Sequence, residues 1–314
     1  MSPRATLACL AVFCAAAAAG CTPDRASRAE LDAYRTLGGS LIGGETTFTG
    51  MRGRYAEYRV TLRSGTGAVV TGRLLEPARN SDGRHPAAER RHPAAVLNDG
   101  RELNSSALDY LPPEFGDVVV LSLDYPRELP YTLDLTALIS RRDSILAAAR
   151  RIPASFSLGA AYLASRGDVD STRIAIAATS FAVPFAVIAA ASNERFRNVA
   201  LIYGAGDLAD VVAANLTIRP RMLRRPIAWL ATRPFTELEP ERYAAAIAPR
   251  RMIMVNGIDD PQMPRAAVES LFHAAREPKT LVWLKTGHLM PTDTALIRAL
   301  VDTALARMPV LRPS

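Results

Sequence analysis

Three side chains in the second half of the chain have the types needed for nucleophilic attack on a carbonyl group. Ser180 lies in the stretch "AATSFA", Asp260 in "MIMVNGIDDPQMP" and His288 in "LVWLKTGHLMP". A serine hydroxyl becomes a nucleophile when a histidine takes its proton, and a carboxylate orients that histidine and stabilises its charged form. We therefore expect Ser180 to be the nucleophile, His288 the general base and Asp260 the acid that holds His288.

The residues around Ser180 have two interpretations. An apolar run at 173–177 precedes the serine and a helical pattern begins near residue 182, which predicts a sharp strand-to-helix turn that exposes the hydroxyl. Such a turn needs small residues two positions before and after the serine, usually glycine, and both positions are alanine here, Ala178 and Ala182. The alternative is that Ser180 is only a small residue of a buried strand.

The acid also has alternatives. Asp259 is the first alternative to Asp260, and Asp207 in "YGAGD" is a more distant one. A plain Asp-Asp-Pro turn without a catalytic role fits the same residues, because aspartate and proline are common in turns.

The base has three competitors among the histidines. His85 and His92 belong to a polar loop, and His273 lies in the middle of a predicted helix, near its apolar face. His288 follows the last predicted strand, where a base is expected, although a loop histidine without a catalytic role fits that position too.

Backbone N–H groups near the serine are expected to stabilise the oxyanion that forms during attack. The N–H of Phe181, directly after the serine, is the first donor. The second donor should follow the predicted strand 94–97, where the chain reads "LNDGRE", and we expect it to be the N–H of Arg101. The side chains of Asn98 or Asn104 are further candidates.

Short apolar runs alternate with helical patterns and predict the scaffold that positions these residues. The runs are 94–97, 118–123, 173–177, 198–203, 252–255 and 280–284, and the helical segments are 134–150, 155–166, 182–193, 264–276 and 293–307. This alternation predicts an α/β fold with a mostly parallel central sheet flanked by helices. A β-hairpin is expected at 55–75, and a helical segment broken by prolines predicts a short cap insertion at about 205–248.

Composition indicates one large globular domain. The chain has 314 residues, 49% of them hydrophobic, and a net charge of +7. The cations are scattered arginines, with lysine only at Lys279 and Lys285, and this pattern argues against nucleic-acid binding. The expected division is a signal peptide at 1–20, a tether and N-terminal segment at 21–50, and the α/β domain at 51–314.

The three cysteines, Cys9, Cys14 and Cys21, all lie near the N-terminus, which excludes a disulfide framework in the body of the protein. A basic start, an apolar stretch at 5–19 and small residues before Cys21 are the layout of a secretory signal. The ending Ala18-Ala19-Gly20-Cys21 resembles a bacterial lipobox, although leucine is more usual at position 18.

The lipobox resemblance implies that Cys21 is lipidated and tethers the chain to a membrane without spanning it. The location is then extracytoplasmic, in the periplasm or at the outer membrane. Ordinary cleavage and secretion, with Cys21 incidental, is the alternative.

Several segments resemble bacterial α/β-hydrolases of the esterase and dienelactone-hydrolase-like kind. They are "VDSTRIAIAATSFAVPFA", "APRRMIMVNGIDDPQMP", "EPKTLVWLKTGH" and "AAVLNDGRE", and the similarity runs from about residue 55 to 310. The order serine, aspartate, histidine is also the order of that fold. Two departures are the alanines around Ser180 and the pair Asp99-Gly100, where relatives often carry His-Gly.

The resemblance implies hydrolysis of a small-molecule carboxylic ester, or a related acyl bond, through a serine acyl-enzyme that needs no cofactor or metal. The alternative is a non-catalytic envelope lipoprotein of the same fold that binds a ligand or partner, an interpretation that the two alanines favour. The arginines of "TIRPRMLRRP" at 217–226 suit an anionic substrate or lipid headgroups, or simply a solvated helix face.

Overall fold

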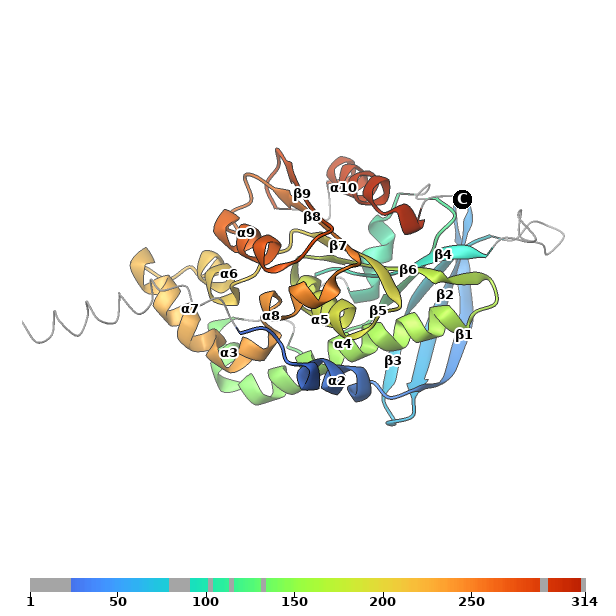
Figure 1. Cartoon of the computed structure of the whole chain (residues 1–314), viewed down its shortest axis with the longest axis horizontal. Helices are drawn as coiled ribbons and strands as arrows, with labels where there is room; N and C mark the ends of the chain where they lie inside the picture. The colour runs from blue at the N-terminus through green and yellow to red at the C-terminus, as the bar shows by residue number, and fades with distance from the viewer. Residues whose placement is uncertain are drawn as a thin grey trace, which may run out of the picture.

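Nine strands form one sheet in the computed structural model, which describes residues 24–78, 91–100, 104–112, 116–130, 134–288 and 293–311 (Figure 1). The expected signal peptide at 1–20, and the residues Cys21, His85 and Arg101, lie outside the described residues. The strands are β1 (Leu41–Arg52), β2 (Tyr55–Ser64), β3 (Val69–Pro77), β4 (His92–Asn98), β5 (Val119–Leu123), β6 (Val169–Thr179), β7 (Phe196–Ile202), β8 (Arg251–Gly257) and β9 (Lys279–Leu284).

The strand order across the sheet is β1-β2-β3-β5-β4-β6-β7-β8-β9. The neighbours from β1 to β5 run antiparallel, and those from β5 through β4 to β9 run parallel. This arrangement confirms the predicted mostly parallel sheet and the hairpin at its edge. The carboxyl ends of the parallel strands therefore meet at one edge, and the direction of strand order reverses at β4, where open sheets of this kind bind ligands.

Strand β1 corrects the expected domain boundary. Residues 41–50, assigned from the sequence to the N-terminal segment, form most of β1 and pair with β2 along its length. Most residues of β1 are exposed or half-buried, so the strand lacks the apolar alternation by which the sequence predicts its neighbours.

Helices cover both faces of the sheet. They are α2 (Arg28–Leu37), α3 (Leu135–Ser140), α4 (Arg142–Ser165), α5 (Val183–Ser192), α9 (Arg265–Ala274) and α10 (Thr294–Arg307). Right-handed crossovers bring α4, α5 and α9 to one face, and α10 returns over the other (Figure 1). Because both faces are covered, β5 is buried along its whole length and β4 along nearly all of it.

Helix α4 differs from the expectation of two helices at 134–150 and 155–166. It runs unbroken through Pro153, after the short helix α3. Proline removes one helical hydrogen bond. The buried side chains on both sides of it, including Ile152 and Phe156, pack in the core and offset that loss.

The segment between β7 and β8 is helical, as expected for 205–248. It contains α6 (Leu208–Asn215), η3 (Arg221–Leu223), α7 (Arg224–Thr232), η4 (Arg233–Leu238), α8 (Glu241–Ala244) and η5 (Ala245–Ile247). Among the described residues, no helix combines the length and apolar character needed to cross a membrane.

Close approach of β3 to β5 joins the antiparallel edge to the parallel part of the sheet. A Cβ atom on Gly72 would lie only 2.3 Å from the carbonyl oxygen of Ser122. We expect Gly72→Ala to lower the free energy of unfolding by about 2 kcal/mol, because the strands must move apart. Urea unfolding measures this, with Gly43→Ala as the control.

The control tests the same substitution without the contact. A Cβ atom on Gly43, in β1, has no other atom within 4 Å, so Gly43→Ala should change stability by no more than about 0.5 kcal/mol. Equal losses in the two variants would contradict the close approach.

Candidate active site

Ser180 occupies a sharp turn between β6 and α5. Its φ angle is +52°, a left-handed backbone conformation that residues other than glycine rarely adopt. The chain leaves the extended conformation at Thr179 and passes through one short turn, Ser180–Ala182, before α5 begins at Val183. This is the strand-turn-helix context expected from the sequence, and Ser180 is not an internal residue of a strand.

The two alanines beside Ser180 have no solvent exposure. Ala178 and Ala182 are both 0% exposed, the first near the end of β6 and the second directly before α5. Strand β6 and helix α5 contact each other, and both alanines belong to the hydrophobic core. The turn forms with alanine at both positions, so glycine is not required for its geometry.

Ser180, His288 and Asp260 contact one another although they lie far apart in the chain. The Ser180 Oγ lies 3.4 Å from the His288 Nε2, and the His288 Nδ1 lies 2.7 Å from the Asp260 Oδ2. The other carboxylate oxygen of Asp260 accepts hydrogen bonds from the N–H groups of Gln262 and Met263, at 2.7 and 3.2 Å. The Asp260 side chain is 1% exposed and that of His288 13%.

The loops that carry Asp260 and His288 are joined by backbone contacts. The N–H of Asp259 donates to the carbonyl oxygen of Thr286, at 3.1 Å. A Cβ atom on Gly257 would lie 2.4 Å from that same oxygen, so only glycine allows the end of β8 to approach the loop after β9 this closely. The contact fixes the distance between the acid and the imidazole.

Tyr203 supports His288 and was not expected from the sequence. Its ring lies 5.0 Å from the His288 ring, between centroids, and its residue is 0% exposed. It follows β7, the strand between β6 and β8. The sequence signal was its place after an apolar run in "NVALIYG", which resembled the positions chosen for Asp260 and His288.

Phe181 is held by two aromatic neighbours. Its ring packs edge-to-face against Tyr125, at 5.5 Å, and Phe185, at 5.2 Å. The N–H of Phe181 lies in the first turn at the start of a helical segment, where backbone N–H groups have no partner within the helix. This N–H can therefore face a bound oxyanion.

The second oxyanion donor stays a prediction, because Arg101 lies outside the described residues. The side chain of Asn98 bonds instead to the backbone of Leu123, donating at 2.6 Å and accepting at 3.3 Å. Asn104 accepts from the N–H of Tyr125, at 3.0 Å. Both amides thus bind neighbouring backbone.

Asp99 brings a second carboxyl group close to His288. Burial raises the pKa of the Asp99 carboxyl to about 6, against the opposing effects of the Gly100 N–H and of His288. The carbonyl oxygen of Asp99 accepts a hydrogen bond from the Tyr125 hydroxyl, at 2.5 Å. Tyr125 therefore connects the loop after β4 to Phe181 and to the turn at Ser180.

The other expected candidates lie elsewhere. His92 is a correction: it is the first residue of β4, at the opposite end of that strand from the site, and not part of a loop. His273 is exposed in the last turn of α9, not on an apolar face. Asp207 caps α6 and pairs with Arg225.

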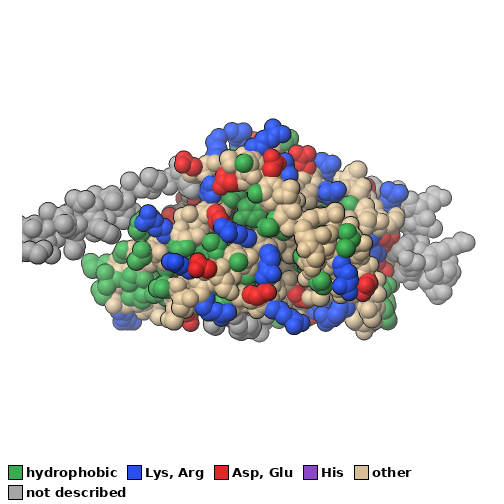
Figure 2. All heavy atoms as spheres, turned by 90° about the horizontal axis from the view of Figure 1, so that it is seen from below, with side chains coloured by type: hydrophobic (Ala, Val, Ile, Leu, Met, Phe, Trp, Pro, Cys, Tyr) green, Lys and Arg blue, Asp and Glu red, His purple; other side chains and the backbone are tan. Residues whose placement is uncertain are grey.

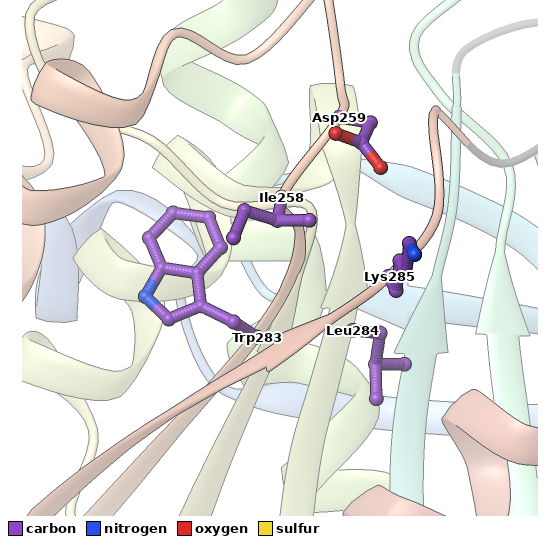
Figure 3. A pocket seen from close by; sticks show the side chains of 5 residues that line it. All are labelled: Ile258, Asp259, Trp283, Leu284 and Lys285. Carbon is purple, nitrogen blue, oxygen red and sulfur yellow. The ribbon is translucent and has the colours of Figure 1, made fainter.

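Asp259 lines a pocket of about 370 Å³ together with Ile258, Trp283, Leu284 and Lys285. Figure 3 shows Trp283 and Ile258 together at one side of this pocket and Asp259 and Lys285 at the other. The described residues contain no group of three or more histidine, cysteine, aspartate or glutamate side chains arranged to hold a metal ion.

The left-handed backbone at Ser180 should cost stability. We expect Ser180→Gly to be more stable than Ser180→Ala by about 1 kcal/mol, because glycine adopts φ +52° without a Cβ clash. At Thr179, with φ −119°, the order should reverse, and alanine should be the more stable substitution. Thermal unfolding of the four variants measures both differences, and the same order at both positions would contradict the strain.

Asp99 should make stability depend on pH. Between about pH 4 and pH 6 the folded chain keeps a proton that the unfolded chain releases, so the free energy of unfolding falls as pH rises. Asp99→Asn removes this loss, and its stability relative to wild type should rise by up to about 3 kcal/mol from pH 4 to pH 7. Urea unfolding at both pH values measures the difference.

A matched control for Asp99 is Asp143→Asn, because the Asp143 side chain is 91% exposed. Its effect should change with pH by less than about 0.5 kcal/mol. A pH-independent effect of Asp99→Asn would show that the Asp99 carboxyl is not buried in the folded chain.

The structure of this chain is similar in fold to solved structures of low sequence identity. No family model and no curated protein sequence matches the chain. Acetyl xylan esterase 1 from Thermoanaerobacterium sp. JW/SL YS485 is 17% identical, with a TM-score of 0.60 over 89% of this chain and 95% of that one. Acetyl xylan esterase from Paenibacillus sp. R4 is 15% identical, with a TM-score of 0.65 over 90% and 96%.

A third similar structure is named an alpha/beta hydrolase. The alpha/beta hydrolase GrgF from Penicillium sp. sh18 is 15% identical, with a TM-score of 0.54 over 80% of this chain and 99% of that one. Together with the strand order and the turn at Ser180, these similarities show that the chain has the α/β-hydrolase fold.

Proposed function

We propose that this protein is a serine hydrolase that cleaves a small carboxylic ester, with Ser180 as nucleophile, His288 as general base and Asp260 as the acid. The observation that carries the proposal is the chain of contacts from Ser180 through His288 to Asp260. These residues come from the ends of three parallel strands. The serine stands on a left-handed turn.

Acylation is the first half of the proposed reaction. The Ser180 oxygen bonds to the acyl carbon, its proton moves to the His288 Nε2, and the carbonyl electron pair moves onto the carbonyl oxygen. The Phe181 N–H, with a second donor, stabilises that oxyanion, and each donor contributes on the order of 3 kcal/mol. His288 then gives its proton to the leaving alcohol oxygen as the carbon–oxygen bond breaks.

Deacylation repeats these steps with water. His288 takes a proton from the water as it attacks the acyl-enzyme and returns it to the Ser180 oxygen, which releases the carboxylic acid. Asp260 stabilises the charged imidazole in both halves, since its carboxylate is buried against the Nδ1. The 3.4 Å distance from serine to histidine fits an enzyme without substrate, where such bonds are often long.

Geometry favours catalysis over a non-catalytic protein of the same fold. That alternative arose from the alanines at 178 and 182, yet the turn accommodates both methyl groups and keeps Ser180 within reach of His288. Acetyl esters are the first substrates to test, because two of the similar structures are named acetyl xylan esterases.

Location is part of the proposal. From the signal-like residues 5–20 and Cys21, we propose that the chain acts outside the cytoplasm and that lipid on Cys21 tethers it to a membrane. Mass spectrometry of the mature protein would detect the lipid, and a mature chain that begins elsewhere would contradict it.

Ser180 should be the residue that reacts. We expect wild type to hydrolyse p-nitrophenyl acetate and to be labelled by a fluorophosphonate probe. Ser180→Ala should lose the label and at least about 10³-fold in kcat/KM. Ser171→Ala is the control: Ser171 lies on the same strand and is exposed, so activity and label should persist.

Two outcomes would contradict this prediction. A folded Ser180→Ala protein with unchanged turnover would remove Ser180 from the mechanism. Folded wild type without label or turnover would favour the non-catalytic alternative.

The two neighbouring aspartates provide a second comparison in the same assay. Asp260→Asn should lower kcat by about 10²-fold or more, because it removes the charge that stabilises the imidazolium. Asp259→Asn should have a much smaller effect, since it is Asp260 that hydrogen-bonds to His288. The reverse order would assign the acid to Asp259.

A further inference from the structure

Helix α7 presents its large apolar side chains to solvent and its small ones to the protein. Ala228, Ala231 and Thr232 are buried, whereas Trp229 is 50% exposed and Leu230 66%. A helix that packs on a core normally does the opposite. The inversion indicates that the outer face of α7 contacts something else.

Neighbouring residues extend this apolar surface. Met222 and Leu223 in η3 are 79% and 44% exposed, and Ile139 in α3, which packs beside α7, is 61% exposed. We call these five side chains the α7 patch: Ile139, Met222, Leu223, Trp229 and Leu230. Figure 2 shows hydrophobic side chains gathered, with lysine or arginine beside them, at the end of the molecule where α7 lies in Figure 1.

Arginines accompany the patch along the chain, and three of them, Arg219, Arg221 and Arg233, are exposed. Within the described residues, Arg219 and Arg221 form no ion pair, and the Arg233 guanidinium lies over the Trp229 ring, 5.4 Å from its centroid. Arg225 differs because it pairs with Asp207 and Asp210. Exposed tryptophan and leucine next to exposed arginines are the composition of a surface that lies in the headgroup region of an anionic membrane.

The position of the α7 patch relative to the start of the described chain supports a membrane as its binding partner. The carbonyl oxygen of Asp24 accepts a hydrogen bond from Arg242 of α8, in the same helical segment as α7, and Figure 1 shows α7 and α8 in the same half of the molecule. Cys21 stands three residues before Asp24, and three residues of chain span at most about 11 Å. A lipid on Cys21 would thus be attached to the half of the molecule that carries the patch.

We propose that the α7 patch is a membrane-docking surface: its apolar side chains enter the interface of a bilayer and Arg219, Arg221 and Arg233 bind anionic lipid headgroups. Docking on this face needs neither the proposed hydrolase activity nor lipid on Cys21.

The two tryptophans allow a test that distinguishes this face from any binding by the N-terminal segment. In the full-length chain, Trp283→Phe leaves Trp229 as the single tryptophan, and Trp229→Phe leaves Trp283. With phosphatidylglycerol vesicles that contain brominated acyl chains, we expect quenching of Trp229 and little quenching of Trp283. Bound protein with equal quenching of the two, or with none, would overturn the proposal.

Surface variants measure the contribution of each part. Substitution of Met222 and Leu230 by serine should weaken partition into anionic vesicles about tenfold or more. Phe48→Ser with Met51→Ser is the matched control, because these residues are 55% and 58% exposed on β1, away from α7, and partition should not change.

Headgroup charge is tested separately. Arg219→Gln and Arg221→Gln should each reduce the preference for phosphatidylglycerol over phosphatidylcholine about fivefold. Hydrolysis of a soluble ester should be unchanged in all surface variants, so failure of docking and failure of the proposed function are distinguishable.

Sedimentation of the protein without vesicles tests whether the patch instead binds a second copy of this chain. If the protein is a dimer that the Met222 and Leu230 substitutions dissociate, and vesicle binding is unaffected, the patch is a dimer interface and membrane docking is overturned.

Discussion

The close contact between the end of β6 and the start of α5 is the constraint on which the site depends. Ser180 can turn its hydroxyl toward His288 only because its backbone is left-handed, and that conformation persists only where packing determines it. The packing comes from Ala178 and Ala182, both fully buried, and from α5, whose side chains are almost all buried. A larger side chain at either alanine would separate strand from helix and release the turn.

Around this turn, two connections hold Ser180, His288 and Asp260 at fixed distances. On one side, the missing side chain of Gly257 lets β8 approach the carbonyl of Thr286, which sets Asp260 beside His288. On the other, Tyr125 packs on Phe181 and bonds to the backbone of Asp99. Both connections use backbone or rigid rings, so little conformational entropy is lost when a substrate binds.

The helical segment between β7 and β8 differs in character from the rest of the fold. In its helix α7 the buried residues are small, and the largest apolar side chains point outward. Solvent exposure of tryptophan and leucine has no benefit for folding, because burial is what makes these side chains stabilising. Their position is understandable if the segment was selected for contact outside the molecule, in the half where the described chain begins.

The sequence by itself determined the fold class, the order of the candidate residues and their place at strand ends. It did so because strands buried on both faces are continuous apolar runs, and because parallel strands bring their carboxyl ends to one edge. Only the tertiary structure decided which aspartate touches His288, that Tyr203 packs against the imidazole, and that β1 joins the sheet. These facts depend on side-chain direction and on contacts between distant segments: Asp259 and Asp260 are adjacent in sequence, yet the loop turns one toward the pocket beside Trp283 and buries the other.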